Sequence, residues 1–374
     1  MKQTIETRGQ WRDRPDNTWS FRNIDAIIPS AGIGNDIAHV VRHAEAAKRW
    51  KPGIFYRSLF KLTSTDALVV LVDGQLRYEF YAHGNAPETP HILMSCSKAV
   101  TGLLLGILAE SGKIDYAAPV SRYLPEMGGT RYAQTSLRDL IDMRAGVLLS
   151  PEEQRAYDLA TNWEPAQATP REANLRDFFH TLSGPSAQGG APFRYVSANT
   201  DLLGWVIERA TGGTIAHLLE EHLWKPMGAE FPAYVTLDQA GLARCAGGIC
   251  ASARDFARLG QLFLTQGKSA ERQVLPPTVI DDICHNADRS AWAAGEWGKV
   301  FSTISKNMGC RSGWYVVGDG PQRIFAMGIH GQGLFVDLEN GVVAAKFSSW
   351  KKPNDPIPFL ATHKAFARLS ALRR

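Results

Sequence analysis

The chain has 374 residues, of which 44% are hydrophobic and 21% charged, and its formal net charge is +4. This composition is close to that of soluble globular proteins and excludes a disordered, collagen-like or coiled-coil chain. The weak net charge, without a block of Lys and Arg, argues against a nucleic-acid partner, so we expect a small-molecule partner. The length indicates one large domain with a sizeable insertion, or two domains that share a cleft.

The N-terminal residues and the apolar runs predict where the protein works. The first residues lack the apolar stretch of a secretory signal, and the longest apolar run, residues 100–109, is too short to cross a bilayer. We therefore expect a cytoplasmic protein with no membrane partner.

The cysteines have no framework spacing, which predicts reduced, mostly buried and inert thiols. They are Cys96, Cys245, Cys250, Cys284 and Cys310. Cys284 and His285 make a poor zinc site because adjacent residues seldom ligate together. We therefore expect no metal ion and no organic cofactor.

Strand patterns lie toward both ends of the chain. Residues 66–82 contain two β-rich runs joined at Asp73-Gly74, a dipeptide that favours a tight hairpin turn. Later in the chain, strands are predicted over residues 323–330, 333–337 and 341–350, followed by a helix over residues 358–372. An antiparallel sheet should therefore form from both chain ends.

The middle of the chain has helical periodicity instead. The predicted helices cover residues 95–110, 136–143, 174–182, 200–211, 214–223 and 253–265. Residues 150–190 are rich in Pro, Gly, Gln and Ala and are predicted to form a long ordered loop or lid. Strands, then helices, then strands predict an α+β fold. Its sheet domain would comprise residues 1–120 and 240–374, and a mostly helical insertion, residues 121–239, would form the other wall of a cleft.

Short motifs limit the choice of nucleophile. The sequence has no G-x-S-x-G elbow, G-x-x-x-x-G-K-[ST] phosphate loop, G-x-G-x-x-G fingerprint or H-E-x-x-H helix. It has S-x-x-K at Ser58 and Lys61, at Ser95 and Lys98, and at Ser348 and Lys351. On a helix, positions i and i+3 share one face, so the serine hydroxyl can approach the lysine amine. A buried lysine has a lowered pKa and can accept the serine proton.

One of these pairs opens a good helix. Ser58 lies in a segment without clear helical period and Ser348 ends a predicted strand, so neither serine should face its lysine. Residues 95–110 are apolar nearly all round, as in a helix buried between two domains. A serine at its N-terminus has free backbone N–H groups nearby for an oxyanion. The alternative is that Ser95 caps the helix and Lys98 is a solvated residue of its first turn.

Further motifs favour the catalytic interpretation. Ser95-Cys96-Ser97-Lys98 is followed by Tyr195-Val196-Ser197 and by a glycine-rich segment, residues 245–260. With these motifs the chain resembles the serine β-lactamase and penicillin-binding-protein-like family, in the branch of class C β-lactamases, family VIII carboxylesterases and 6-aminohexanoate-dimer hydrolases. The likeness runs from about Phe55 to the C-terminus. It implies a β-lactamase/transpeptidase-like fold, in which an antiparallel sheet flanked by helices carries an inserted mostly helical domain.

The resemblance also implies roles for residues. Ser95 would be the nucleophile, Lys98 its base and Tyr195 the proton donor to the leaving group, with Ser197 beside it in the second motif. In this branch a lid residue can contact the substrate's amine, which makes Tyr157 and Asp158 candidates by position.

The third family motif, Lys-Thr-Gly or His-Thr-Gly, is not matched. Its nearest candidate is His330-Gly331-Gln332, with His330 a candidate substrate-binding residue. Counted back from the turn at residues 337–341, the second oxyanion N–H falls nearer Met327, and His330 lies past the motif position. In the family the motif lysine helps to bind the carboxylate of β-lactams, so its absence argues against penicillin recognition.

The predicted function is a serine hydrolase that cleaves small esters or linear amides through an acyl-enzyme. Two alternatives stay open: a β-lactamase or DD-peptidase, and a non-catalytic binding protein that keeps the fold. A homodimer also stays open.

Overall fold

The computed structural model describes residues 11–163, 173–319 and 322–373. In this part of the chain the largest sheet has eight strands, and neighbouring strands are antiparallel except for the parallel pair of β2 with β4. In sheet order the strands are β10 (Met308–Arg311), β11 (Trp314–Val317), β12 (Arg323–Gly328), β13 (Gln332–Asp337), β14 (Val342–Ser348), β3 (Thr65–Val72), β4 (Gln75–Tyr81) and β2 (Ala44–Glu45).

The hairpin of β3 and β4 turns at the predicted dipeptide. Asp73 and Gly74 both have positive φ, 48° and 78°, as in the tight turns that join antiparallel strands. Along β3, Val69 and Leu71 pack in the core on one side of the sheet, whereas Val70 packs in the core on the other. Burial on both faces explains why residues 67–72 of this strand are continuously apolar instead of alternating.

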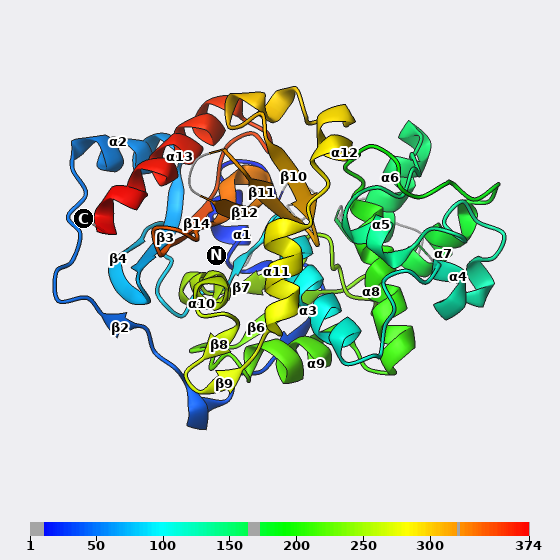
Figure 1. Cartoon of the computed structure of the whole chain (residues 1–374), viewed down its shortest axis with the longest axis horizontal. Coiled ribbons are helices and arrows are strands. Elements are labelled where there is room, and N and C mark those ends of the chain that lie inside the picture. The colour runs from blue at the N-terminus through cyan, green and yellow to red at the C-terminus, as the bar shows by residue number, and fades with distance from the viewer. Residues whose placement is uncertain (1–10, 164–172, 320–321, 374) are drawn as a thin grey trace.

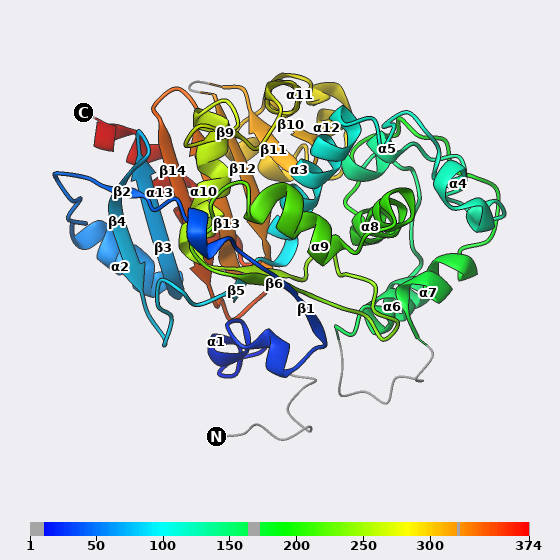
Figure 2. The same ribbon diagram turned by 90° about the horizontal axis from the view of Figure 1, so that it is seen from below.

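Helices cover both faces of the sheet (Figures 1 and 2). Helices α2 (Ile54–Leu62) and α13 (Pro356–Leu369) pack together on one face. Helix α10 (Ala253–Leu264) lies against β13, β14 and β3 on the other face, with α3 (Ser97–Glu110) and α11 (Pro277–His285) beside it. An antiparallel sheet flanked by helices confirms the predicted fold class.

A smaller sheet, which sequence patterns did not predict, leads into helix α3. Its four strands are, in sheet order, β1 (Ser30–Ile33), β6 (Ala233–Thr236), β7 (Ile249–Ala251) and β5 (His91–Ile92). Directly after β5, the Leu93 N–H donates to the carbonyl oxygen of Ile249 at 2.8 Å. This sheet therefore fixes the point at which the Ser95 segment enters α3.

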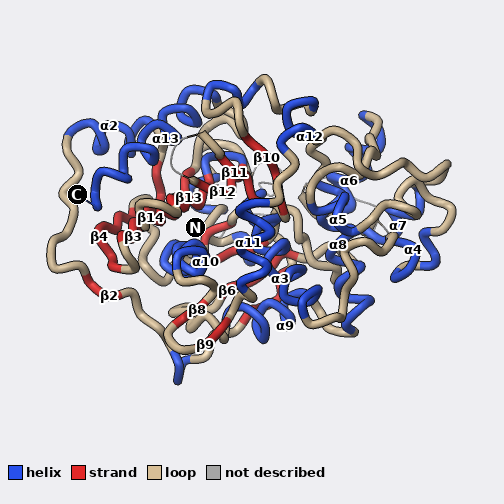
Figure 3. The backbone as a smooth tube through the Cα atoms, viewed as in Figure 1, coloured by secondary structure: helices blue, strands red, loops and turns tan. Residues whose placement is uncertain are grey.

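Between α3 and α10 the chain is mostly helix and loop (Figure 3). The helices there are α4 (Val120–Tyr123), α5 (Leu137–Ile141), α6 (Pro151–Ala160), α7 (Leu175–Thr181), α8 (Ser197–Thr211) and α9 (Ile215–Leu219), with a π-helical turn, Glu220–Trp224. Other short helices and strands are α1 (Asn17–Ser20), α12 (Arg289–Ala294), β8 (Lys268–Ser269) and β9 (Arg272–Gln273), and short 3₁₀ helices lie between the elements. The domain boundaries at residues 121 and 239 stay a prediction.

The prediction of one long loop over residues 150–190 is wrong. Helix α6 begins after Ser150, whose hydroxyl accepts the N–H of Glu153, and the Glu153 carboxylate accepts the N–H of Ser150. This capping box, with proline at the first helical position, is readable in the sequence Ser-Pro-Glu-Glu. Residues 164–172 of the predicted lid lie outside the described residues.

Gly102 lets helix α3 approach the turn between β10 and β11. A Cβ atom at this position would overlap the backbone oxygen of Ser312, which cannot move aside as the end of a side chain can. We expect Gly102→Ala to lower the free energy of unfolding by about 1–3 kcal/mol in chemical denaturation, although alanine is the better helix former. Gly32→Ala is the control, because a Cβ there meets nothing within 4 Å and should not lower stability. Equal losses in both variants would contradict the packing argument.

Candidate active site

Ser95 lies in a 3₁₀ turn, Met94–Cys96, between β5 and α3. Met94 has a left-handed φ of 48°, a backbone conformation that is uncommon outside glycine and occurs often at functional sites. The residue that caps α3 is Cys96, whose side chain makes no capping hydrogen bond. Ser95 therefore does not serve as the cap, which removes half of the alternative interpretation.

Lys98 is buried, with 3% of its surface exposed, which excludes the alternative of a solvated lysine. Its Nζ lies 3.2 Å from Ser95 Oγ and donates to the carbonyl oxygen of Ala246 at 2.6 Å. Burial lowers the pKa of Lys98 well below that of a free lysine, and the positive charge of Arg244 lowers it further. A neutral amine beside the hydroxyl is suited to take its proton.

Tyr195 approaches Ser95 from the loop before α8. Its hydroxyl donates to Ser95 Oγ at 2.7 Å, and its ring stacks on Trp297 with centroids 4.7 Å apart. Burial raises the pKa of Tyr195 to about 12, although hydrogen bonds with Ser95 and Ser197 oppose the rise. The phenol therefore keeps its proton at neutral pH and is suited to donate it. The predicted Ser197 lies next to it as the first residue of α8.

A buried network that the sequence did not predict supports Lys98. Asp201 Oδ1 accepts the N–H of Ala246 at 2.7 Å, which fixes the peptide whose carbonyl receives Lys98 Nζ. The other carboxylate oxygen pairs with Arg244 and accepts the hydroxyl of Tyr157 at 2.5 Å. The sequence does contain a signal for this network: Asp201 and Arg244 are charged residues inside apolar or glycine-rich segments, where burial requires a charged partner.

The end of strand β12 lies against Ser95. A Cβ atom on Gly328 would stand 3.0 Å from the Ser95 backbone nitrogen and 2.8 Å from Met94 Cβ, so glycine permits this close approach. Met327 and Ile329 flank Gly328 and line the cavity at Ser95. The strand is therefore placed to offer a backbone N–H to an oxyanion, and Met327 as that donor stays a prediction.

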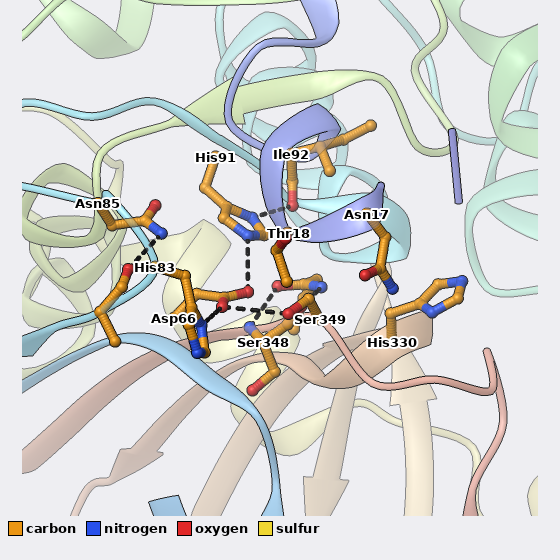
Figure 4. Close-up of polar contacts among 12 residues, drawn as sticks. Asn17, Thr18, Asp66, His83, Asn85, His91, Ile92, His330, Ser348 and Ser349 are labelled. Carbon is orange, nitrogen blue, oxygen red and sulfur yellow. Dashed lines mark hydrogen bonds and ion pairs between the residues drawn. The ribbon is translucent and has the colours of Figure 1, made fainter. Parts of the chain in front are cut away.

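His330 does not line either cavity at Ser95 within the described residues. Its Nδ1 lies 2.7 Å from the carbonyl oxygen of Trp350, and its ring packs edge-on against Phe21 at 5.2 Å between centroids. Figure 4 shows it beside Asn17, at the N-terminal segment. With φ of 60°, the backbone at His330 turns the side chain into packing contacts, so the structure does not support a substrate-binding role.

A second polar cluster surrounds Asp66 (Figure 4). Its carboxylate accepts the hydroxyl of Ser349 at 3.1 Å and lies 2.6 Å from His83 Nδ1 and 3.4 Å from His91 Nε2. The serine hydroxyl donates directly to the carboxylate, without the intervening imidazole of a Ser-His-Asp triad. Asp66, His91 and Ser349 are also at most 1% exposed. The cluster therefore joins the hairpin, β5 and the end of β14, with the Ser349 hydroxyl and the Asp66 carboxylate buried.

Two cavities meet at Ser95, and both have the size of a small-molecule site. The first, about 360 Å³, has mostly polar and charged walls that include Gln154, Asp158, Arg194, Ser197, Arg244 and Glu296. The predicted Tyr157 also lines it, but the Tyr157 hydroxyl is held by Asp201. The second cavity, about 400 Å³, has mostly apolar walls.

Within residues 11–163, 173–319 and 322–373, no helix is long and apolar enough to cross a membrane. The same residues hold no group of three or more His, Cys, Asp or Glu side chains that could bind a metal ion. All five cysteines are buried, in agreement with the prediction, and none of them forms a disulfide bond.

Comparison with known proteins gives consistent results. A sequence profile of the Beta-lactamase family matches residues 61–368. The 6-aminohexanoate-dimer hydrolase of Paenarthrobacter ureafaciens is 30% identical over 359 residues, which cover 93% of this chain and 89% of that protein. A solved structure from Bacillus anthracis, which carries the same name provisionally, has 25% identity and a TM-score of 0.84 over 98% of this chain and 96% of its own. The hydrolase EstCE1 shares the fold at 16% identity, with a TM-score of 0.62 over 83% of this chain and 98% of that one.

Proposed function

Since the chain belongs to the Beta-lactamase family and is a hydrolytic enzyme of the serine hydrolase type, we propose that it cleaves small esters or linear amides through an acyl-enzyme on Ser95. One observation carries the proposal: Lys98 Nζ and Tyr195 OH both approach Ser95 Oγ, at 3.2 and 2.7 Å, where two cavities meet. The relative's name, a hydrolase of an amide dimer, supports linear amides as one substrate class.

In acylation, Ser95 Oγ attacks the carbonyl carbon of the substrate while its proton passes to the neutral amine of Lys98. The carbonyl oxygen becomes an oxyanion, which the backbone N–H of Ser95 and a backbone N–H of β12, such as that of Met327, would stabilise. The Tyr195 phenol, protonated at neutral pH, gives its proton to the departing alcohol or amine as the bond to the carbonyl carbon breaks. Lys98 then returns a proton to Tyr195.

Deacylation follows the same steps with water as the nucleophile. A water molecule attacks the ester carbon of the acyl-enzyme and gives its proton to the neutral amine of Lys98. Ser95 Oγ leaves with a proton from the same group, which restores the hydroxyl and releases the carboxylic acid. All of these transfers use side chains that already contact Ser95.

A fluorophosphonate probe tests the nucleophile by mass spectrometry. We expect wild-type protein to gain a single adduct on Ser95 and Ser95→Ala to gain none, with its turnover of short-chain p-nitrophenyl esters lowered at least about 10³-fold. Ser58→Ala, in the exposed S-x-x-K pair on α2, is the matched control and should behave as wild type. No adduct on wild type, or the same adduct on Ser95→Ala, would contradict the mechanism. Turnover of nitrocefin faster than of the esters would favour a β-lactamase.

A further inference from the structure

The second cavity at Ser95 is built differently from the first. Its walls include a set of aromatic and aliphatic side chains, called here the aromatic chamber: Trp297, Val300, Phe301, Tyr315, Met327, Phe335 and Phe359. Ser95, Tyr195 and Ile329 line both cavities, so a molecule bound at the nucleophile can extend into each of them. The chamber therefore adjoins the nucleophile.

The chamber walls are ordered by ring contacts. Trp297 stacks on Tyr195 at 4.7 Å and on Phe301 at 5.3 Å between centroids, and Phe359 meets Phe301 edge-on at 5.4 Å. These rings hold each other in place without a ligand. Val300, which lines this cavity, is 66% exposed, so its apolar surface is available for an apolar ligand to cover.

The two cavities differ sharply in charge. The first cavity contains Asp158, Arg194, Arg244 and Glu296 among its walls. The charged residue among the described walls of the chamber is Asp355, which caps α13 by accepting the N–H of Ile357 at 3.1 Å. A carboxylate placed in the chamber would lose water without gaining an opposite charge, and it would face the negative Asp355.

We propose that the aromatic chamber binds an uncharged alkyl chain or aromatic ring on one side of the scissile bond, while a polar or charged portion of the same substrate occupies the first cavity. The proposal rests on the proposed function and specifies its substrate class. The preferred substrates are esters or amides with one hydrophobic half.

Comparing three ester substrates tests which side of the scissile bond carries the hydrophobic group that enters the chamber. Ethyl hexanoate and hexyl acetate are isomers that carry the six-carbon chain on the acyl and the alcohol side, and ethyl acetate is the short reference. Burial of each methylene is worth about fourfold in kcat/KM, so one of the two long esters should exceed ethyl acetate at least about tenfold when acid release is followed. The same long chain ending in a carboxylate should lose that gain.

Val300→Asp introduces a charge into the chamber at an exposed position that folding tolerates. We expect it to reduce the chain-length gain to less than about threefold, whereas Leu62→Asp, at a 62% exposed site on α2, should keep it. The same esters are titrated into Ser95→Ala and Ser95→Ala/Val300→Asp by tryptophan fluorescence, which measures binding without chemistry. The inference would be overturned if neither turnover nor binding favoured a long ester over ethyl acetate. It would also be overturned if that preference were unchanged in Val300→Asp. If the hydrolase mechanism fails instead, the wild-type protein will show no turnover and no Ser95 adduct. The binding measurements on Ser95→Ala would then still test whether the aromatic chamber prefers the long esters.

Discussion

Replacing Lys98 with methionine is expected to lower kcat/KM for an ester substrate by at least about three orders of magnitude while the protein remains folded. Methionine has nearly the same length and suits a buried position, but it cannot accept the Ser95 proton. Its main structural effect is that the Ala246 carbonyl oxygen loses the hydrogen bond that it accepts from Lys98 Nζ at 2.6 Å. We expect this loss to lower the free energy of unfolding by about 1–3 kcal/mol. Thermal unfolding followed beside the kinetics separates the two effects.

The S-x-x-K pair on α2 supplies the matched control for Lys98→Met. Ser58 and Lys61 have the same spacing but are both exposed on a helix, although the sequence showed no helical period there. Lys61→Met should therefore leave kcat/KM unchanged and alter stability by less than about 0.5 kcal/mol. A similar loss of activity in both variants would show that the charge of the protein, and not the base at Ser95, determines the rate.

The pH dependence of the wild-type enzyme offers a second measure of Lys98. The mechanism needs its neutral amine, so kcat/KM should fall as the pH drops through the lowered pKa of Lys98 and the amine takes a proton. Because burial and then Arg244 lower that pKa, this acid limb should lie well below the pKa of an exposed lysine. A limb at the pH where free lysine titrates would contradict a buried neutral base.

The sequence predicts best those features that depend on near neighbours. Ser95 and Lys98 lie one helical turn apart, and Asp73-Gly74 determines its own turn, so both could be predicted from local spacing. Tyr195 could be placed through its motif, and the structure brings it to Ser95. Helix α6 was missed although its capping box lies within four consecutive residues, because the composition of the surrounding stretch dominated the prediction.

Features that depend on distant partners could not be predicted. Strand β5 has two residues, too few for a periodic pattern, and it forms a sheet by pairing with β7 far along the chain. The positive φ of His330 decides where its ring points, and no residue type reveals that angle. The aromatic chamber likewise gathers side chains from β11, β12, β13, α13 and the segment after α12, so no single stretch of sequence carries its signal.

Asp201→Asn is the second change with a large expected effect, because it breaks a buried ion pair. Asp201 and Arg244 are 0% and 6% exposed in their side chains, and removing one charge leaves the other buried without compensation. We expect a loss of about 3–5 kcal/mol in the free energy of unfolding. Asp115→Asn, in an exposed pair with Arg122, is the control and should cost less than about 1 kcal/mol in the same denaturation experiment.

Asp201 should also act on the reaction as a positioning residue, through Ala246 and Arg244. Asparagine can still accept the Ala246 N–H, but the uncompensated positive charge of Arg244 then disfavours the protonated form of Lys98. The pKa of Lys98 should fall further, so the acid limb of kcat/KM should move to lower pH in Asp201→Asn, with kcat reduced more than KM changes. A purely structural role would reduce the amount of active enzyme and leave the limb in place. An unmoved limb, measured on the folded fraction, would therefore show that the buried pair stabilises the cavity wall without tuning the base.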